Sequence, residues 1–144
     1  MQFYEPSSAR AMLVETVDID DEDVVSAVEE PYFGAVLIYA HREAERALPE
    51  LHFLLKSAES LQEHNRILAS YDGERLYLVV VEDAVMRICN SFKAQDFTTA
   101  EYFLFMVLKK FQMNPEMSSI YFRTRLTDDQ KLSLYQYFKA VEQI

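Results

Sequence analysis

The sequence predicts an α/β protein whose C-terminal half follows the order β-β-β-α-β-α. Two observations predict the first strands: the apolar runs 67–71 and 76–81 flank an Asp-Gly turn, and a third run, 84–92, follows a Glu-Asp turn. A third observation predicts the helices. Two segments with apolar residues at helical spacing come next, and the strand-like run 118–122 lies between them.

The N-terminal half predicts a smaller α-β-β-α-β segment. Pro6 suits the first turn of a helix, and Pro49 ends a charged helix because proline cannot continue one. The expected elements are a helix at 6–14, strands at 24–28 and 35–39, a helix at 42–48, a strand at 52–55 and a short helix or loop at 57–63. We therefore expect residues 1–63 to be the remainder of a preceding lobe and residues 64–144 to form a lobe of their own.

Capping patterns predict where the two C-terminal helices begin. Thr98 is followed three residues later by Glu101, which is the spacing of a capping box before a long apolar helix at 98–113. The apolar positions of this helix recur at helical spacing: Phe103, Leu104, Val107, Leu108 and Phe111. Thr127 and Gln130 form a second capping box. The last helix is expected to carry Leu134, Phe138 and Val141 on one face.

The charge of the chain limits its partners. Its 144 residues include 14 basic and 24 acidic side chains, so the formal net charge is −10. Nucleic-acid binding is disfavoured, since affinity for phosphates depends on Lys and Arg. Apolar runs are too short to span a bilayer, and the N-terminus does not read as a signal peptide. We expect an acidic cytoplasmic protein that binds neither nucleic acid nor membrane.

No pattern predicts a catalytic or metal centre. Cys89 is the one cysteine, and it lies in a strand-like run that favours a buried structural thiol. The three histidines lack the spacing of a zinc site. The acidic cluster 18–23 lacks the glycine of a calcium-binding loop and is interpreted as a solvated loop. We therefore expect no enzyme activity, no catalytic residue and no bound metal.

The order of the second half is that of ribonuclease H and of one lobe of actin, the sugar kinases and the Hsp70 ATPase domain. A nuclease needs carboxylates on its first and fourth strands to hold metal ions, and 67–71 and 119–122 contain none. An actin-like ATPase needs a glycine-rich phosphate loop between its first two strands. The turn here contains Asp72 and Gly73, with Glu74 next. A plain hairpin turn is favoured over a phosphate site, which leaves nucleotide binding as the alternative.

Several segments resemble an uncharacterised family of Bacteroidetes, domain of unknown function 3822. The segments that carry the resemblance are Gly34 to Ala40, Leu48 to Phe53, Leu76 to Val81, Asn90-Ser91-Phe92, Thr98 to Leu108 and Ser119 to Phe122. The resemblance implies an actin-like ATPase fold with no established activity. Members are longer and have an N-terminal lobe, so this chain is expected to match their middle and C-terminal part. No site residue transfers with the resemblance.

These observations favour a bacterial interaction or scaffold protein that is not an enzyme. The segment 98–113 is apolar on nearly every side, as is typical of a helix that is buried on two faces or lies at an interface. We expect Tyr102, Phe105 and Met106 to belong to a surface that pairs with a protein partner or with a second copy. The alternative is a degenerate or regulatory nucleotide-binding protein with Asp72 and Gly73 near the phosphates of magnesium-ATP.

Overall fold

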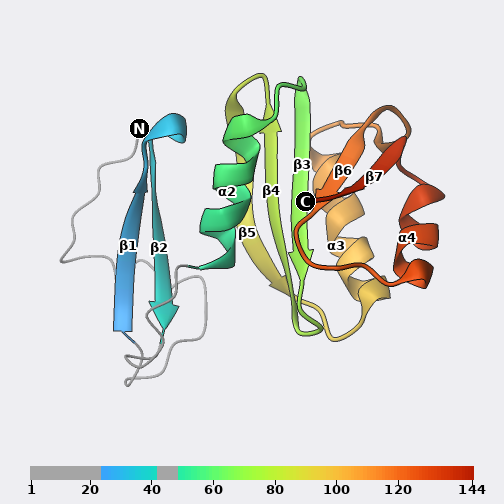
Figure 1. Ribbon diagram of the computed structural model, residues 1–144, viewed down its shortest axis with the longest axis horizontal. Helices are drawn as coiled ribbons and strands as arrows, with labels where there is room; N and C mark the ends of the chain where they lie inside the picture. Colours follow the sequence, from blue (N-terminus) through green and yellow to red (C-terminus); the bar gives the residue numbers. More distant parts are fainter. Residues whose placement is uncertain (1–23, 42–48) are drawn as a thin grey trace.

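A computed structural model describes residues 24–41 and 49–144. The helices expected at 6–14 and 42–48 and the acidic cluster 18–23 lie outside these residues. Within them, the element order is β1-η2-β2-α2-β3-β4-β5-α3-η3-β6-α4-β7 (Figure 1). The expected order β-β-β-α-β-α is confirmed for the C-terminal half, and one further strand follows it.

The C-terminal half is built on a five-stranded sheet with the order β5-β4-β3-β6-β7. Its strands are β3 (Asn65–Tyr71), β4 (Arg75–Glu82), β5 (Val85–Lys93), β6 (Ser119–Phe122) and β7 (Ala140–Gln143). The first three form an antiparallel meander, whereas β6 is parallel to β3 and β7 is parallel to β6. This is the strand order of a ribonuclease-H-like lobe.

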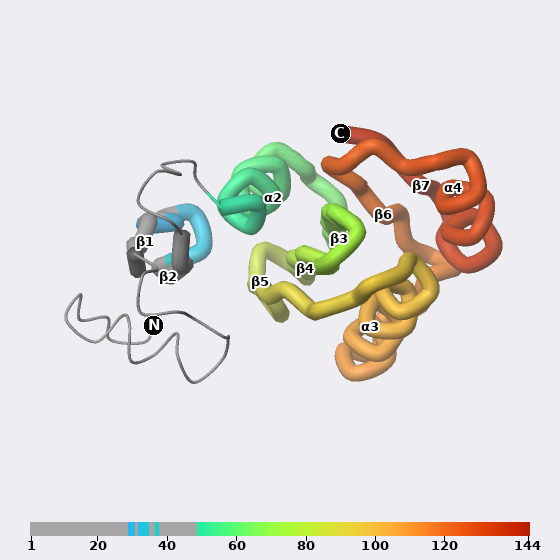
Figure 2. Tube along the Cα trace, turned by 90° about the horizontal axis from the view of Figure 1, so that it is seen from below, coloured from blue at the N-terminus to red at the C-terminus, as the bar shows by residue number. Residues whose placement is uncertain are grey.

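Helices cover both faces of this sheet. The helix α2 (Glu50–Ser60) lies over one face of β3 and β4, and α3 (Phe97–Lys110) lies over the other (Figure 2). The helix α4 (Asp128–Tyr135) lies beside β7 on the α3 side (Figure 2). The sheet is therefore the middle of three layers, with a core on each side.

The central strands supply side chains to both cores. Ile67 and Ala69 of β3 pack toward α3, while Leu68 between them packs toward α2. On β4, Leu78 packs toward α3 and Val79 packs toward α2. Because successive side chains point to opposite faces, a strand buried on both faces must be apolar throughout. This explains why 67–69 and 76–81 are continuous apolar runs. The buried Ser70 that follows the first run donates a hydrogen bond to Glu50.

Two tight turns join the meander. Gly73 has a φ of 90°, which an L side chain rarely adopts, so the expected Asp-Gly turn is confirmed. The second turn is centred on Asp83 and Ala84, with φ of 49° and 64°. Two successive positive φ values define the twisted two-residue hairpin turn. The strand β5 accordingly begins at Val85.

One expected strand is wrong, and two other expected elements differ in extent. The segment 52–55, expected to be a strand, belongs to α2, because Leu51, Leu54 and Ala58 recur at helical spacing and pack into the same core. The short helix or loop expected at 57–63 is partly the end of α2. The last helix ends at Tyr135, and Val141 lies in β7.

The start of α3 is also different from the expected capping box. Asp96 is the N-cap, and its carboxylate accepts a hydrogen bond of 2.7 Å from the backbone N–H of Thr99. This bond lowers the pKa of Asp96. Thr98 lies in the first turn, and Glu101 instead accepts hydrogen bonds from the Ser133 hydroxyl of α4. The capping box of Thr127 and Gln130 is confirmed.

The N-terminal strands form a separate antiparallel hairpin. They are β1 (Val24–Glu30) and β2 (Ala35–His41), joined by the 3-10 turn η2 (Pro31–Phe33). Both strands were expected, with slightly shorter bounds. Phe33 and Leu37 pack against the core below α2, so the hairpin is connected to the lobe on the α2 side.

None of the helices in residues 24–41 and 49–144 is long and apolar enough to cross a membrane.

We predict that Asp96→Ala lowers the midpoint of thermal unfolding by a few degrees, because a first-turn N–H loses its acceptor. Thr98→Ala is the matched control and leaves the midpoint almost unchanged, since Thr98 caps nothing. Circular dichroism melts of the two variants measure the difference. A larger effect for Thr98→Ala than for Asp96→Ala would contradict this assignment and favour Thr98 as the N-cap of the helix.

Candidate functional site

The carboxyl ends of β3 and β6 meet at one edge of the sheet. In open α/β sheets, ligands bind outside the carboxyl ends of the parallel strands. The residues that follow these ends are Asp72 and Gly73 after β3 and Arg123 and Thr124 after β6. The structure therefore places Asp72 and Gly73 at this edge of the sheet, together with Arg123 and Thr124.

The turn after β3 satisfies its own backbone donors. Asp72 Oδ1 accepts hydrogen bonds from the backbone N–H groups of Glu74, at 2.9 Å, and of Arg75, at 2.8 Å. The Tyr77 hydroxyl donates to Asp72 Oδ2 at 3.4 Å. A phosphate held by a loop needs such N–H groups to point at the ligand. Here the carboxylate of Asp72 occupies them.

The nearby guanidinium is paired as well. Arg123 Nη1 lies 2.7 and 2.5 Å from the two carboxylate oxygens of Glu50, the first residue of α2. The Ser70 hydroxyl donates to the same carboxylate at 2.6 Å. The Arg123 guanidinium also lies over the Phe53 ring, 4.4 Å from its centroid. These contacts join α2 to β3 and β6 and use the charge that a phosphate would need.

The second expected site is an apolar surface on α3. Tyr102 and Met106 are 63% and 44% exposed, one helical turn apart. Phe105, between them in sequence, is half-buried, and its ring centroid lies 4.7 Å from that of Tyr137. We call Tyr102, Phe105, Met106 and Tyr137 the α3 surface. Sequence reasoning missed Tyr137 because the last helix was expected to continue through it.

The α3 surface adjoins a basic helix end. Lys109 and Lys110 are exposed in the last turn of α3, and Glu101 is the only acidic residue of that helix. Glu101 faces α4, where it accepts hydrogen bonds of 2.8 and 2.9 Å from Ser133. Burial raises the pKa of Glu101. An otherwise acidic protein thus carries a neutral to basic apolar helix.

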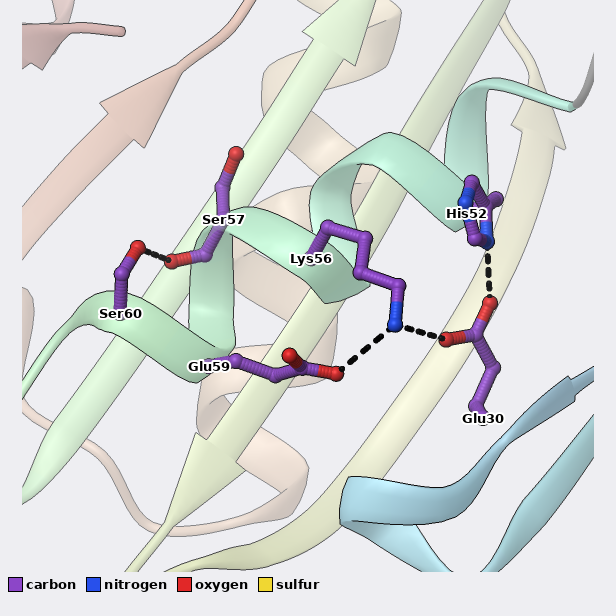
Figure 3. Close-up of polar contacts among 6 residues, drawn as sticks. All are labelled: Glu30, His52, Lys56, Ser57, Glu59 and Ser60. Carbon is purple, nitrogen blue, oxygen red and sulfur yellow. Dashed lines mark hydrogen bonds and ion pairs between the residues drawn. The ribbon is translucent and has the colours of Figure 1, made fainter.

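A third cluster, which the sequence did not predict, connects the hairpin to α2. Glu30 at the end of β1 is fully buried, and its Oε1 lies 2.5 Å from Nδ1 of His52 (Figure 3). Lys56, one turn further along α2, points toward Oε2 of the same carboxylate at 3.8 Å and toward Glu59 at 3.3 Å (Figure 3). Glu30 Oε2 is buried and has no hydrogen bond within the described residues.

This cluster is a polar contact in a place where apolar packing is usual. A carboxylate inside a protein must be paired, because its desolvation costs several kcal/mol. His52 and Lys56 therefore specify where Glu30, and with it the hairpin, sits on α2. Glu30 and His52 are 22 positions apart in the sequence, so no local sequence pattern predicts the pair.

Cys89 lies in β5, as expected, and packs at the margin of the core below α2. Burial and the nearby charge of Glu30 raise the pKa of this thiol to about 12. The thiol therefore stays protonated near neutral pH, which is typical of a structural cysteine. Within residues 24–41 and 49–144, no three His, Cys, Asp or Glu side chains form a group that could hold a metal ion.

The sheet order, the two-sided helix layers and the carboxyl edge define a lobe of the ribonuclease-H-like class. The chain belongs to the family described as protein of unknown function (DUF3822), whose sequence profile matches residues 38–141. The family expected from the resemblance is thereby confirmed. No curated protein matches the chain.

A solved structure from Bacteroides thetaiotaomicron VPI-5482 has a similar fold. It is described as a protein with actin-like ATPase fold and unknown function. The TM-score is 0.74 at 15% sequence identity, and the match covers 98% of this chain and 61% of that chain. The expected fold class is thereby confirmed. The present chain spans about three fifths of the length of its structural relative.

We predict that His52→Ala lowers the free energy of unfolding by about 3–5 kcal/mol, because it leaves the buried Glu30 carboxylate without its closest partner. Lys56→Ala, which removes a longer contact from an exposed side chain, costs about 0.5 kcal/mol. Urea denaturation of the single variants and of Glu30→Gln/His52→Ala completes a double-mutant cycle. A coupling energy of zero between positions 30 and 52 would contradict the assignment.

Proposed function

We propose that this protein is a non-catalytic interaction protein of the bacterial cytoplasm, and that its α3 surface pairs with a second copy of the chain. The observation that carries the proposal is the exposure of Tyr102 and Met106 on a helix whose opposite face is core. Soluble monomers rarely expose large contiguous apolar patches, and those that exist are often interaction sites.

The elements around α3 carry most of the exposed apolar side chains from which such an interface would be built. A stable pairing buries about 800 Å² on each partner. Most of the large apolar side chains exposed in the described residues come from α3, α4 and the segment after α4. They are Tyr102, Met106, Leu132, Tyr135 and Tyr137. Tyrosine and methionine are enriched in interface cores, which agrees with this composition.

Charge makes α3 the surface at which a second copy is repelled least. Two acidic proteins repel each other over most of their surfaces, and the formal charge here is −10. The helix α3 is the exception, because Lys109 and Lys110 outnumber Glu101 in it. Contact through α3 therefore brings together the surfaces of the chain that repel least and offers two lysines to acidic groups of the partner.

We predict that the protein is a dimer in solution at micromolar concentration. Tyr102→Ser/Met106→Ser converts it to a monomer, because the apolar area lost lies at the centre of the proposed interface. Light scattering on a size-exclusion column measures the molar mass. Val85→Ser, which removes a half-exposed apolar side chain at the β4–β5 turn, is the control and leaves the dimer intact.

A monomeric wild type would contradict the proposal, and so would a dimer that persists in Tyr102→Ser/Met106→Ser. Far-ultraviolet circular dichroism of that variant distinguishes loss of the interface from loss of the fold. Both side chains are exposed, so we expect the spectrum to be unchanged.

Nucleotide binding is the alternative proposal, and it makes an opposite prediction. We expect millimolar magnesium-ATP to leave the midpoint of thermal unfolding unchanged, because Asp72 already occupies the N–H groups of the turn and Glu50 already pairs with Arg123. A ligand at 100 times its Kd would stabilise the fold by about 2.7 kcal/mol. A rise of several degrees with magnesium-ATP, but not with magnesium chloride alone, would favour the alternative.

A further inference from the structure

The β1–β2 hairpin contacts the lobe without sharing its sheet. Its two strands form an antiparallel sheet of their own, while β3 to β7 form the five-stranded sheet. Phe33 and Leu37 of the hairpin pack against the core below α2, and the Tyr32 hydroxyl accepts a hydrogen bond of 3.3 Å from Arg66 of β3. An element that has no ladder hydrogen bonds to the rest of a fold can open locally, whereas the central strands open only with the whole fold.

Glu30 both positions the hairpin and weakens its attachment. The carboxylate is fully buried, and its Oε1 has a close partner in His52 Nδ1 at 2.5 Å (Figure 3). Its Oε2 has no hydrogen bond within the described residues, and Lys56 Nζ, on a side chain that is 45% exposed, lies 3.8 Å from it. A buried ion pair repays the lost hydration only when its remaining lone pairs are also satisfied. Water would satisfy Oε2 if the hairpin opened, so the burial of this carboxylate opposes docking.

Cys89 of β5 lies close to this contact. It packs at the margin of the core against which Phe33 and Leu37 also pack. Burial, with a further contribution from the negative charge of Glu30, raises the pKa of the thiol to about 12. A charge shifts the pKa of another group in this way over a short distance. Cys89 is the one cysteine of the chain, so its modification reports on this place alone.

We propose that the β1–β2 hairpin is a releasable cover, which detaches from α2 as a unit while the five-stranded sheet stays folded. The buried charge of Glu30 sets the balance between the closed and the open state. Opening hydrates the carboxylate, separates Phe33 and Leu37 from the lobe and gives solvent access to Cys89. The cover lies on the α2 side of the sheet, so the inference is independent of the α3 surface and of the proposed dimer.

The test measures how fast iodoacetamide alkylates Cys89 of the full chain under native conditions, followed by mass spectrometry. His52→Ala leaves the buried carboxylate without its close partner and favours the open state, so we expect alkylation at least about tenfold faster than in the wild type. Ser60→Ala is the matched control on α2. The Ser60 hydroxyl is exposed and donates to the Ser57 carbonyl of its own helix, so its loss should change the rate by less than about twofold. Equal rates for His52→Ala and the wild type would overturn the proposal.

A second variant tests whether the charge of Glu30 is the cause. A neutral amide costs less to bury than a carboxylate, so Glu30→Gln/His52→Ala should react several-fold more slowly than His52→Ala. Alkylation occurs in the open state, where the charge at position 30 no longer acts on the thiol. Equal rates in these two variants would contradict the role assigned to Glu30.

Urea distinguishes a local opening from unfolding of the whole chain. The free energy of opening is derived from the rate of alkylation at urea concentrations below the unfolding transition. It should fall with urea less steeply than the free energy of global unfolding, because release of the hairpin exposes less surface. Equal slopes would mean that Cys89 reacts only when the whole chain unfolds, which would also overturn the proposal.

Discussion

The structure depends above all on the burial of β3 and β4 on both faces. Leu68 and Val79 pack under α2, while Ile67 and Leu78 pack under α3, and all four are fully buried. Each of these strands therefore connects the two hydrophobic cores, which β6 also joins through Ile120 on one side and Tyr121 on the other. Burial of one such side chain contributes about 1.5–3 kcal/mol. The edges of the sheet, where the polar groups gather, are positioned by this apolar centre.

Much of the lobe can be predicted from the sequence because its signals are local. The Asp72-Gly73 turn, the continuous apolar runs and the capping box at Thr127 each lie within a few residues of the element that they define. The errors occur where short segments were ambiguous. The run 52–55 has no alternation, so only its packing decides that it belongs to α2, and β7 has four residues that pair with the equally short β6.

The candidate sites were predicted only where one element carries them. Tyr102 and Met106 share one face of one helix, so helical spacing is enough to group them. A pocket at the amino edge, where β3 and β6 begin, draws on residues from 63 to 139, and the contact between Glu30 and His52 joins positions 22 residues apart. The residues of the pocket meet through the sheet order β5-β4-β3-β6-β7, whose parallel pairs have no sequence signature. Glu30 and His52 meet because the separate β1–β2 hairpin packs against the α2 side of the lobe.

The two edges of the sheet differ in a way that a fold assignment does not reveal. At the carboxyl edge, Asp72 bonds to the N–H groups of its own turn and Arg123 pairs with Glu50, so each polar group is satisfied within the chain. At the amino edge, Tyr121 donates to Glu63 and Arg87 donates to Glu82, and both glutamates line the pocket of about 480 Å³. An actin-like fold directs attention to the first edge. The hydrogen bonds show which groups at each edge already have partners within the chain, and a function has to be argued from those groups and not from the fold.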